Sequence, residues 1–192
     1  MNPPFLKHIL FVLSLCLFSS NSIAAQWYHV ELIVFENLNS ISDEKWPVMD
    51  VKRGKLSLGG GSKIVRSANI STLMEVASRL NKSSQYRVYY HRAWKQPIMR
   101  KGREKSIDLV AGNNKISGSI KLYKSTYLHA ELDIWLTENT VQFDGEFVAS
   151  QEGSNIGRLR NPNLKETRRI RSEKLYFFDH PKLGAILKLT PI

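Results

Sequence analysis

Two acidic residues, Glu131 and Asp133, lie two positions apart in an alternating segment, which would place both carboxylates on one face of a strand. Paired carboxylates supply the acid and the base in glycoside hydrolysis. A solvated strand face carries such pairs without any catalytic role, and we favour this simpler interpretation. One Ser-x-x-Lys pattern, from Ser42 to Lys45, lacks the companion motifs of a penicillin-binding fold.

The histidines beyond residue 25 show no metal-ligand spacing such as His-Glu-x-x-His. One of them stands in Asp179-His180-Pro181, which predicts a turn in which Asp and Pro set the backbone and hold the imidazole. The sequence therefore predicts no catalytic residue, no metal and no cofactor. The four histidines are His29, His91, His129 and His180.

A stronger pattern combines cations with aromatic side chains on predicted strands. Arginine binds carboxylates through a bidentate fork, and flat aromatic rings suit the apolar faces of sugar rings. A groove lined by both would bind a glycopeptide. The alternative is that the aromatic residues form the core and the arginines are ordinary strand-edge cations, one of them neutralising Glu31. The candidate ligand-binding residues are Arg87, His91, Trp94, Arg168, Arg169, Arg171 and Tyr176.

The elements that would position these residues are mostly strands. Trp27–Glu36 is rich in aromatic and β-branched residues and is apolar on both faces at its far end, which predicts a central strand. Glu31 in its middle needs a partner if it is buried, because an isolated buried charge is costly. Tyr86–Trp94, Arg168–Phe178 and Gly184–Thr190 predict further strands.

A hairpin and a helix complete the predicted fold. Lys115–Tyr123 and Tyr127–Thr137 alternate cleanly, which predicts antiparallel strands with one wet face. Ile70–Asn81 repeats apolar residues at helical spacing, and Asn69 or Ser71 would cap its start. We predict an α+β fold, with a mainly antiparallel sheet of about five to seven strands and this helix covering one face.

Residues 1–25 have the three parts of a removable export signal: a polar start, an apolar run over Ile9–Phe18, and small residues up to Ala25. An uncleaved anchor is the first alternative, but a spanning helix needs roughly 20 apolar residues. A lipoprotein signal acylated at Cys16 is the second, but Leu15 stands where that chemistry requires a small residue.

We predict cleavage near Ala25, which would leave residues 26–192 as a single periplasmic domain without a transmembrane segment. Cys16 is the only cysteine, so the mature chain would contain no disulfide and no thiol nucleophile. The net charge is +11. An exported protein does not normally meet nucleic acid, so the anionic partners of this charge would be lipid headgroups, lipopolysaccharide phosphates or cell-wall carboxylates. The alternative interpretation is that the positive charge only keeps the protein soluble.

Three blocks of the sequence resemble the CsiV family of periplasmic peptidoglycan-binding proteins. The first is Trp-Tyr-x-Val-Glu-Leu-Ile-Val-Phe-Glu from Trp27, the second runs from Leu80 to Pro97, and the third from Arg168 to Pro191. Tyr127-Leu128-His129 fits between the second and third blocks. The blocks occur in the family's order, and from the first to the last they span nearly all of the chain beyond the leader.

This resemblance implies a non-enzymatic protein that binds peptidoglycan and supports its synthesis. The implied route is through a lipoprotein activator of a bifunctional penicillin-binding protein. The resemblance implies no cofactor, and it assigns no ligand residue. The alternative function is a protein-interaction adaptor of the wall-synthesis machinery, whose wall binding is incidental and driven by charge.

Overall fold

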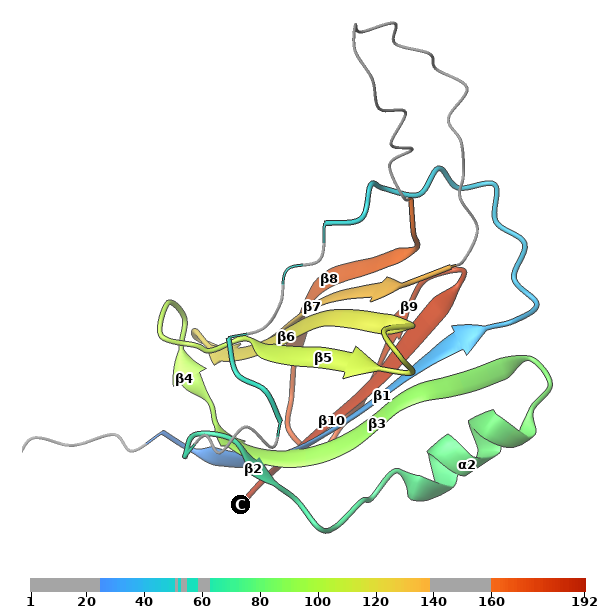
Figure 1. Ribbon diagram of the computed structural model, residues 1–192. Helices are drawn as coiled ribbons and strands as arrows, with labels where there is room; N and C mark the ends of the chain where they lie inside the picture. Colours follow the sequence, from blue (N-terminus) through green and yellow to red (C-terminus); the bar gives the residue numbers. More distant parts are fainter. Residues whose placement is uncertain (1–24, 51, 53–54, 59–62, 139–159) are drawn as a thin grey trace, which may run out of the picture.

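The computed structural model describes residues 25–50, 52, 55–58, 63–138 and 160–192 (Figure 1). The predicted export signal lies outside the described residues except for Ala25. Within the described ranges, no helix is long and apolar enough to span a membrane.

Ten strands in the described residues form two sheets that pack against each other (Figure 1). The strands are β1 (Trp27–Asn37), β2 (Arg66–Ser67), β3 (Tyr86–Pro97), β4 (Met99–Arg100), β5 (Ile107–Ala111), β6 (Ile116–Lys124), β7 (Leu128–Leu136), β8 (Asn163–Ile170), β9 (Leu175–Asp179) and β10 (Leu183–Pro191). The first sheet has the order β2-β3-β1-β10-β9. The second has the order β4-β6-β7-β8, with β5 also paired to β6.

The α+β class and the antiparallel pairing are confirmed, since only β4 and β6 pair in parallel among the named strands. The strands divide over two sheets instead of the single sheet predicted. Alternation in a sequence shows which face of a strand is buried, but it does not show which sheet the strand joins.

Strand β1 is central, as predicted, because it pairs along its length with β3 on one side and β10 on the other. Val30, Leu32 and Val34 are fully buried in the main core between the two sheets. Ile33 and Phe35 point the other way into a smaller core under the helix. Burial on both faces explains why this segment is apolar on both sides.

The helix α2 (Met74–Lys82) begins later than the predicted Ile70–Asn81. Leu73 is its N-cap residue and makes no side-chain capping bond, so the predicted caps, Asn69 and Ser71, are wrong. The chain just before Met74 instead turns its backbone amides towards β1. Leu73 and Ala77 bury the helix on the first sheet, whereas Ile70 remains 71% exposed.

The predicted strand Arg168–Phe178 is two strands that belong to different sheets. Strand β8 pairs with β7 in the second sheet, and β9 pairs with β10 in the first. The turn between them contains Glu173 with a φ of 63°, and the Arg171 amide donates to the Tyr176 hydroxyl at 2.6 Å. A left-handed residue interrupts the extended backbone, so the chain crosses from one sheet to the other.

The β6–β7 hairpin is confirmed, and its register places side chains of the outer face directly opposite one another. Lys121 lies opposite Glu131, and their charged groups are 2.5 Å apart. Gly118 lies opposite Ile134 with a φ of 145°, and a Cβ built there would be 2.0 Å from the carbonyl oxygen of Asp133. This position therefore requires glycine.

Candidate functional site

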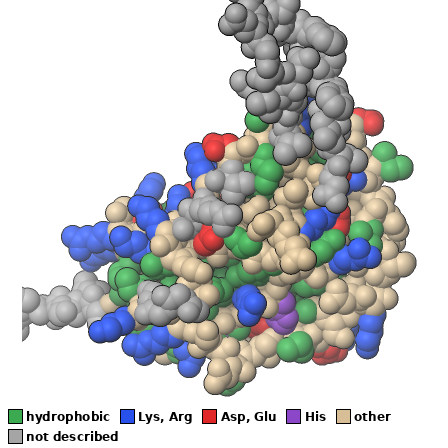
Figure 2. All heavy atoms as spheres, in the orientation of Figure 1, with side chains coloured by type: hydrophobic (Ala, Val, Ile, Leu, Met, Phe, Trp, Pro, Cys, Tyr) green, Lys and Arg blue, Asp and Glu red, His purple; other side chains and the backbone are tan. Residues whose placement is uncertain are grey.

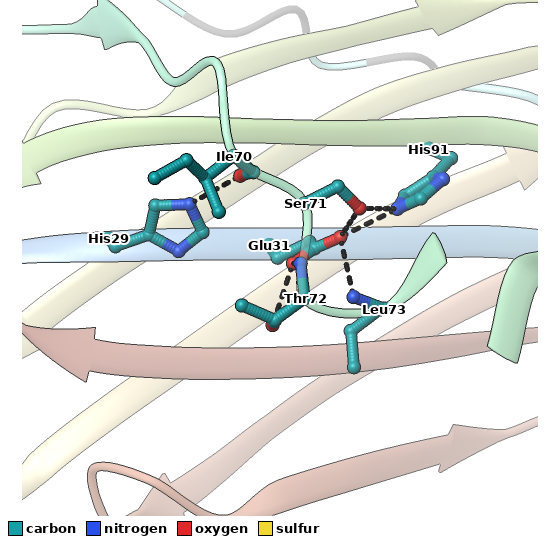
Figure 3. Close-up of polar contacts among 7 residues, drawn as sticks. All are labelled: His29, Glu31, Ile70, Ser71, Thr72, Leu73 and His91. Atoms are coloured by element: carbon teal, nitrogen blue, oxygen red, sulfur yellow. Dashed lines mark hydrogen bonds and ion pairs between the residues drawn. The ribbon is translucent and has the colours of Figure 1, made fainter. Parts of the chain in front are cut away.

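A buried carboxylate, Glu31, organises the polar contacts between β1, β3 and the start of α2 (Figure 3). One carboxylate oxygen, Oε1, accepts from the Leu73 amide at 3.0 Å, from His91 Nε2 at 2.7 Å and from the Ser71 hydroxyl. The other oxygen, Oε2, accepts from the amide of Thr72 at 2.7 Å and from its hydroxyl at 2.9 Å. Glu31, which lies on strand β1, therefore caps the start of helix α2.

The network explains how a carboxylate is tolerated at a fully buried position. Burial by itself would raise the pKa of Glu31, but hydrogen bonds from Ser71, His91 and the amides of Thr72 and Leu73 lower it to about 2. The partner that the sequence requires for Glu31 is therefore present. It is a histidine and a helix start, not an arginine.

Ser71, His91 and Glu31 do not form a nucleophilic triad. In such a triad, one imidazole nitrogen accepts from serine while the other donates to the acid. Here Ser71 Oγ and Glu31 Oε1 both contact the same nitrogen, His91 Nε2, at 3.2 and 2.7 Å, and Ser71 donates its proton to Glu31. This nitrogen cannot serve as a base for Ser71 while it donates to Glu31, so the geometry is that of a structural cap.

A cleft of about 440 Å³ adjoins this network, and Ser71 and His91 belong to its wall. Its lining residues come from strands β3 and β5, from residues 57–58 and from the segment 67–74. The lining mixes hydroxyl, amide and charged groups with apolar side chains: Ser57, Leu58, Ser67, Ala68, Asn69, Ser71, Met74, Tyr90, His91, Arg92, Ala93, Trp94, Asp108 and Val110.

The hydroxyl of Tyr90 is the unusual group in this wall. Tyr90 is 4% exposed, and its hydroxyl has no hydrogen-bond partner among the described residues. Burial raises the pKa of Tyr90, with Arg92 opposing and Asp108 reinforcing the shift, so the phenol is neutral and able to donate. Native structures rarely leave a buried hydroxyl without a partner.

The backbone edge of β3 is open beside the cleft. Strand β2 pairs with β3 only at Lys95 and Trp94, and the Ala68 amide extends this contact to the carbonyl of Ala93 at 3.2 Å. Among the described strands, none pairs with this side of β3 from 89 to 92. A short stretch of main chain is therefore available for pairing.

The three candidate residues on β3 lie in different surroundings. His91 borders the cleft and contacts Glu31. Trp94 also borders it but is fully buried, and its indole nitrogen donates to Gln96 at 2.6 Å. Arg87 is exposed and lies opposite Glu36 of β1, beyond the cleft.

Three further candidates gather at the junction of β8 and β9. Arg168 is held by two hydrogen bonds, to the Phe177 carbonyl at 2.8 Å and to Glu166 at 2.7 Å. Arg171 is exposed, and its amide is the one that contacts the Tyr176 hydroxyl. These three residues join two strands, which gives them a structural role whether or not they meet a ligand.

Arg169 points away from that junction. Its guanidinium lies over the ring of Tyr127, 3.1 Å from the ring centroid. The seven candidates therefore do not share one groove. Sequence reasoning omitted three lining residues of the cleft, Tyr90, Arg92 and Asp108, because only the packing of β3 near β5 brings them together.

The other side chains considered as candidates for catalysis contact neighbouring residues. Glu131 pairs with Lys121, and Asp133 accepts from the Asn163 amide group at 2.9 Å. His180 lies in the predicted turn, where its Nδ1 accepts from the Lys182 amide at 3.2 Å, and burial lowers its pKa. The described residues contain no group of three His, Cys, Asp or Glu that would hold a metal ion.

Lys and Arg side chains gather at one end of the molecule, around β4 (Figure 2). Most of these cations are free to meet an anionic surface, because their side chains are exposed. One of them, Arg66, also stacks over the ring of Trp27 at 4.8 Å from its centroid. The exposed cations of this region are Arg66, Lys95, Arg100, Lys101, Arg103, Lys105 and Lys124.

The model of one protein family, described as "Peptidoglycan-binding protein, CsiV", matches residues 61–192. The match contains the second and third resembling blocks, β3 and the strands of the second sheet, whereas the block at Trp27 precedes it. No curated protein and no solved structure matches the chain. Since the matched residues make up more than half of the sequence, the chain belongs to the CsiV family of peptidoglycan-binding proteins.

Proposed function

We propose that residues 26–192 form a periplasmic domain that binds peptidoglycan without catalysing its cleavage. The family match carries this proposal. The described residues support it with a polar cleft and exposed cations that suit the carboxylates of the wall. The contact among Ser71, His91 and Glu31 has the geometry of a helix cap, which supports a role in folding instead of catalysis.

The finer proposal is that the domain supports wall synthesis through a lipoprotein activator of a bifunctional penicillin-binding protein. A protein-docking surface is favoured by β9, which is an edge strand of the first sheet. Leu175 and Phe177 on this strand are 57% and 48% exposed, and Arg168 and Arg171 lie beside them. An edge strand with exposed apolar groups is suited to pairing with another chain.

The alternative is an adaptor whose wall contact is only electrostatic. The same edge strand favours this function, because it requires a protein partner and no specific glycan or peptide site. The two functions differ in their response to salt, since screening weakens contacts between exposed charges more than contacts inside a cleft.

Sedimentation of purified residues 26–192 with sacculi, at low and at high salt, tests the proposal. We expect co-sedimentation that persists at high salt, and no release of soluble muropeptides. Binding that disappears at high salt would favour the adaptor, and muropeptide release would contradict the non-enzymatic function. Cross-linking in living cells from a photoreactive residue at Phe177 would then identify the protein partner of β9.

A further inference from the structure

The cleft between β3 and β5 carries opposite charges on its two walls. Arg92 stands on β3 and Asp108 on β5, and both line the cleft together with Tyr90. Within the described part of the chain, Arg92 forms no ion pair with a carboxylate. A carboxylate such as that of Asp108 has several acceptor positions, so it can receive an ammonium in addition to its existing contacts.

These charges select the chemistry of a ligand. A guanidinium suits a carboxylate and a carboxylate suits an ammonium, so a zwitterionic ligand complements both walls. The peptide stem of peptidoglycan carries free carboxylates and, on its diamino acid, a free ammonium. The glycan strand offers only hydroxyl and acetamido groups once its lactyl carboxyls are joined to stems.

The open edge of β3 adds the geometry of a peptide site. An extended peptide pairs with an exposed strand edge through main-chain hydrogen bonds, and its side chains enter adjacent pockets. The free stretch at His91 is short, because Ala68 closes the edge at Ala93 and the Asn81 side chain accepts from the Val88 amide at 2.9 Å. It suits a short peptide instead of a full strand.

We propose that this cleft binds the peptide stem of peptidoglycan along the open edge of β3. Arg92 pairs with a stem carboxylate, Asp108 faces the stem ammonium, and the Tyr90 hydroxyl hydrogen-bonds to the enclosed part of the ligand. The unpartnered hydroxyl of Tyr90 is thereby explained as a group reserved for a ligand. This inference rests on the proposed function and assigns its binding site.

Calorimetric titration with two purified probes tests the assignment. One probe is a disaccharide carrying a tetrapeptide stem, and the other is the same disaccharide with its lactyl carboxyl converted to a simple amide in place of the stem. We expect the wild-type chain to bind the first probe and not the second. Equal binding of both probes would overturn the assignment to the stem.

Two variants locate the site. Arg92→Ala and Tyr90→Phe are each expected to weaken binding of the stem-bearing probe by about fivefold or more. Tyr90→Phe should not lower the melting temperature, because it removes a hydroxyl that has no partner in the part of the chain that the structure describes. Arg79→Ala, an exposed arginine on α2, is the matched control and should bind like wild type.

The outcomes separate this inference from the proposed function. If wild type binds the stem-bearing probe and both cleft variants bind it equally well, the cleft is not the site and the proposed function remains. If wild type binds neither this probe nor intact sacculi, both the site and the function are contradicted.

Discussion

Glu31 is a carboxylate in the middle of a buried strand, yet it stabilises the fold because it is charged. Its pKa of about 2 lies below the ordinary value of 4.5, so its charge favours the folded state above pH 4.5. The stabilisation is lost as the pH falls towards 2. This difference in pKa corresponds to about 3 kcal/mol.

Glu31→Gln should therefore lower the free energy of unfolding by about 3 kcal/mol at neutral pH. The substitution replaces one acceptor oxygen with a donor, which would face the Thr72 amide at the Oε2 position or the Leu73 amide at the Oε1 position. Urea unfolding of variant and wild type at pH 7 and pH 3 measures the loss, which should shrink at pH 3. Glu75→Gln is the control, since this exposed carboxylate should contribute less than about 1 kcal/mol.

An equal loss at both pH values would contradict the electrostatic explanation. The sequence could predict that Glu31 needs a partner, because the surrounding strand is apolar. It could not predict that His91 and the start of α2 supply it, because these partners lie 60 and about 40 residues away along the chain. Which long-range contacts form depends on the packing of helix against sheet.

At the scale of elements, the sequence predicted strands better than their interruptions. The alternation of β6 placed Gly118 on the buried face, and the hairpin register agrees. Nothing in the alternation indicated its positive φ or the close approach of the Asp133 carbonyl. The same limitation made β8 and β9 look like one strand, since the turn at Glu173 lies between two segments of strand-forming residues.

Gly118→Ala should destabilise the protein by about 3 kcal/mol or more, because the new Cβ would collide with backbone that a paired strand holds in place. Gly102→Ala is the control with a positive φ of 89° and nothing within 4 Å of the added carbon. It should cost about 1 kcal/mol from backbone strain alone. Thermal or urea unfolding measures both variants, and equal losses would rule out the collision as the cause.

At the scale of the whole molecule, the exposed cations around β4 and those near the end of β8 belong to the same end of the second sheet. Strand β4 pairs with β6 at Lys124, Lys124 lies opposite Leu128 of β7, and Leu128 lies opposite Ile170 of β8, the residue between Arg169 and Arg171. The net charge of +11 therefore includes neighbouring cations that raise the rate of encounter with an anionic wall. The charge can be counted from the sequence, but this grouping required the strand register.

Replacing both Arg169 and Arg171 by Glu should weaken co-sedimentation with sacculi, and the effect should be larger at low salt. Both residues are exposed cations, and exposed cations attract an acidic polymer. Replacing Arg79 and Lys82 by Glu gives the same change in net charge on helix α2.

Equal losses in the two double variants would mean that only the net charge matters. Unchanged binding in the first would remove Arg169 and Arg171 from the wall-binding surface. A selective loss would place a second contact region outside the β3–β5 cleft, which neither arginine lines, as an extended polymer allows.

Ser71 and His91 belong to two structures at once, because they line the cleft and also hold the carboxylate that caps α2. Any molecule that fills the cleft must touch side chains whose other contacts fix the first turn of the helix. The backbone protons of Thr72 and Leu73, which Glu31 binds, are therefore natural spectroscopic reporters of occupancy, built into the chain without an added label.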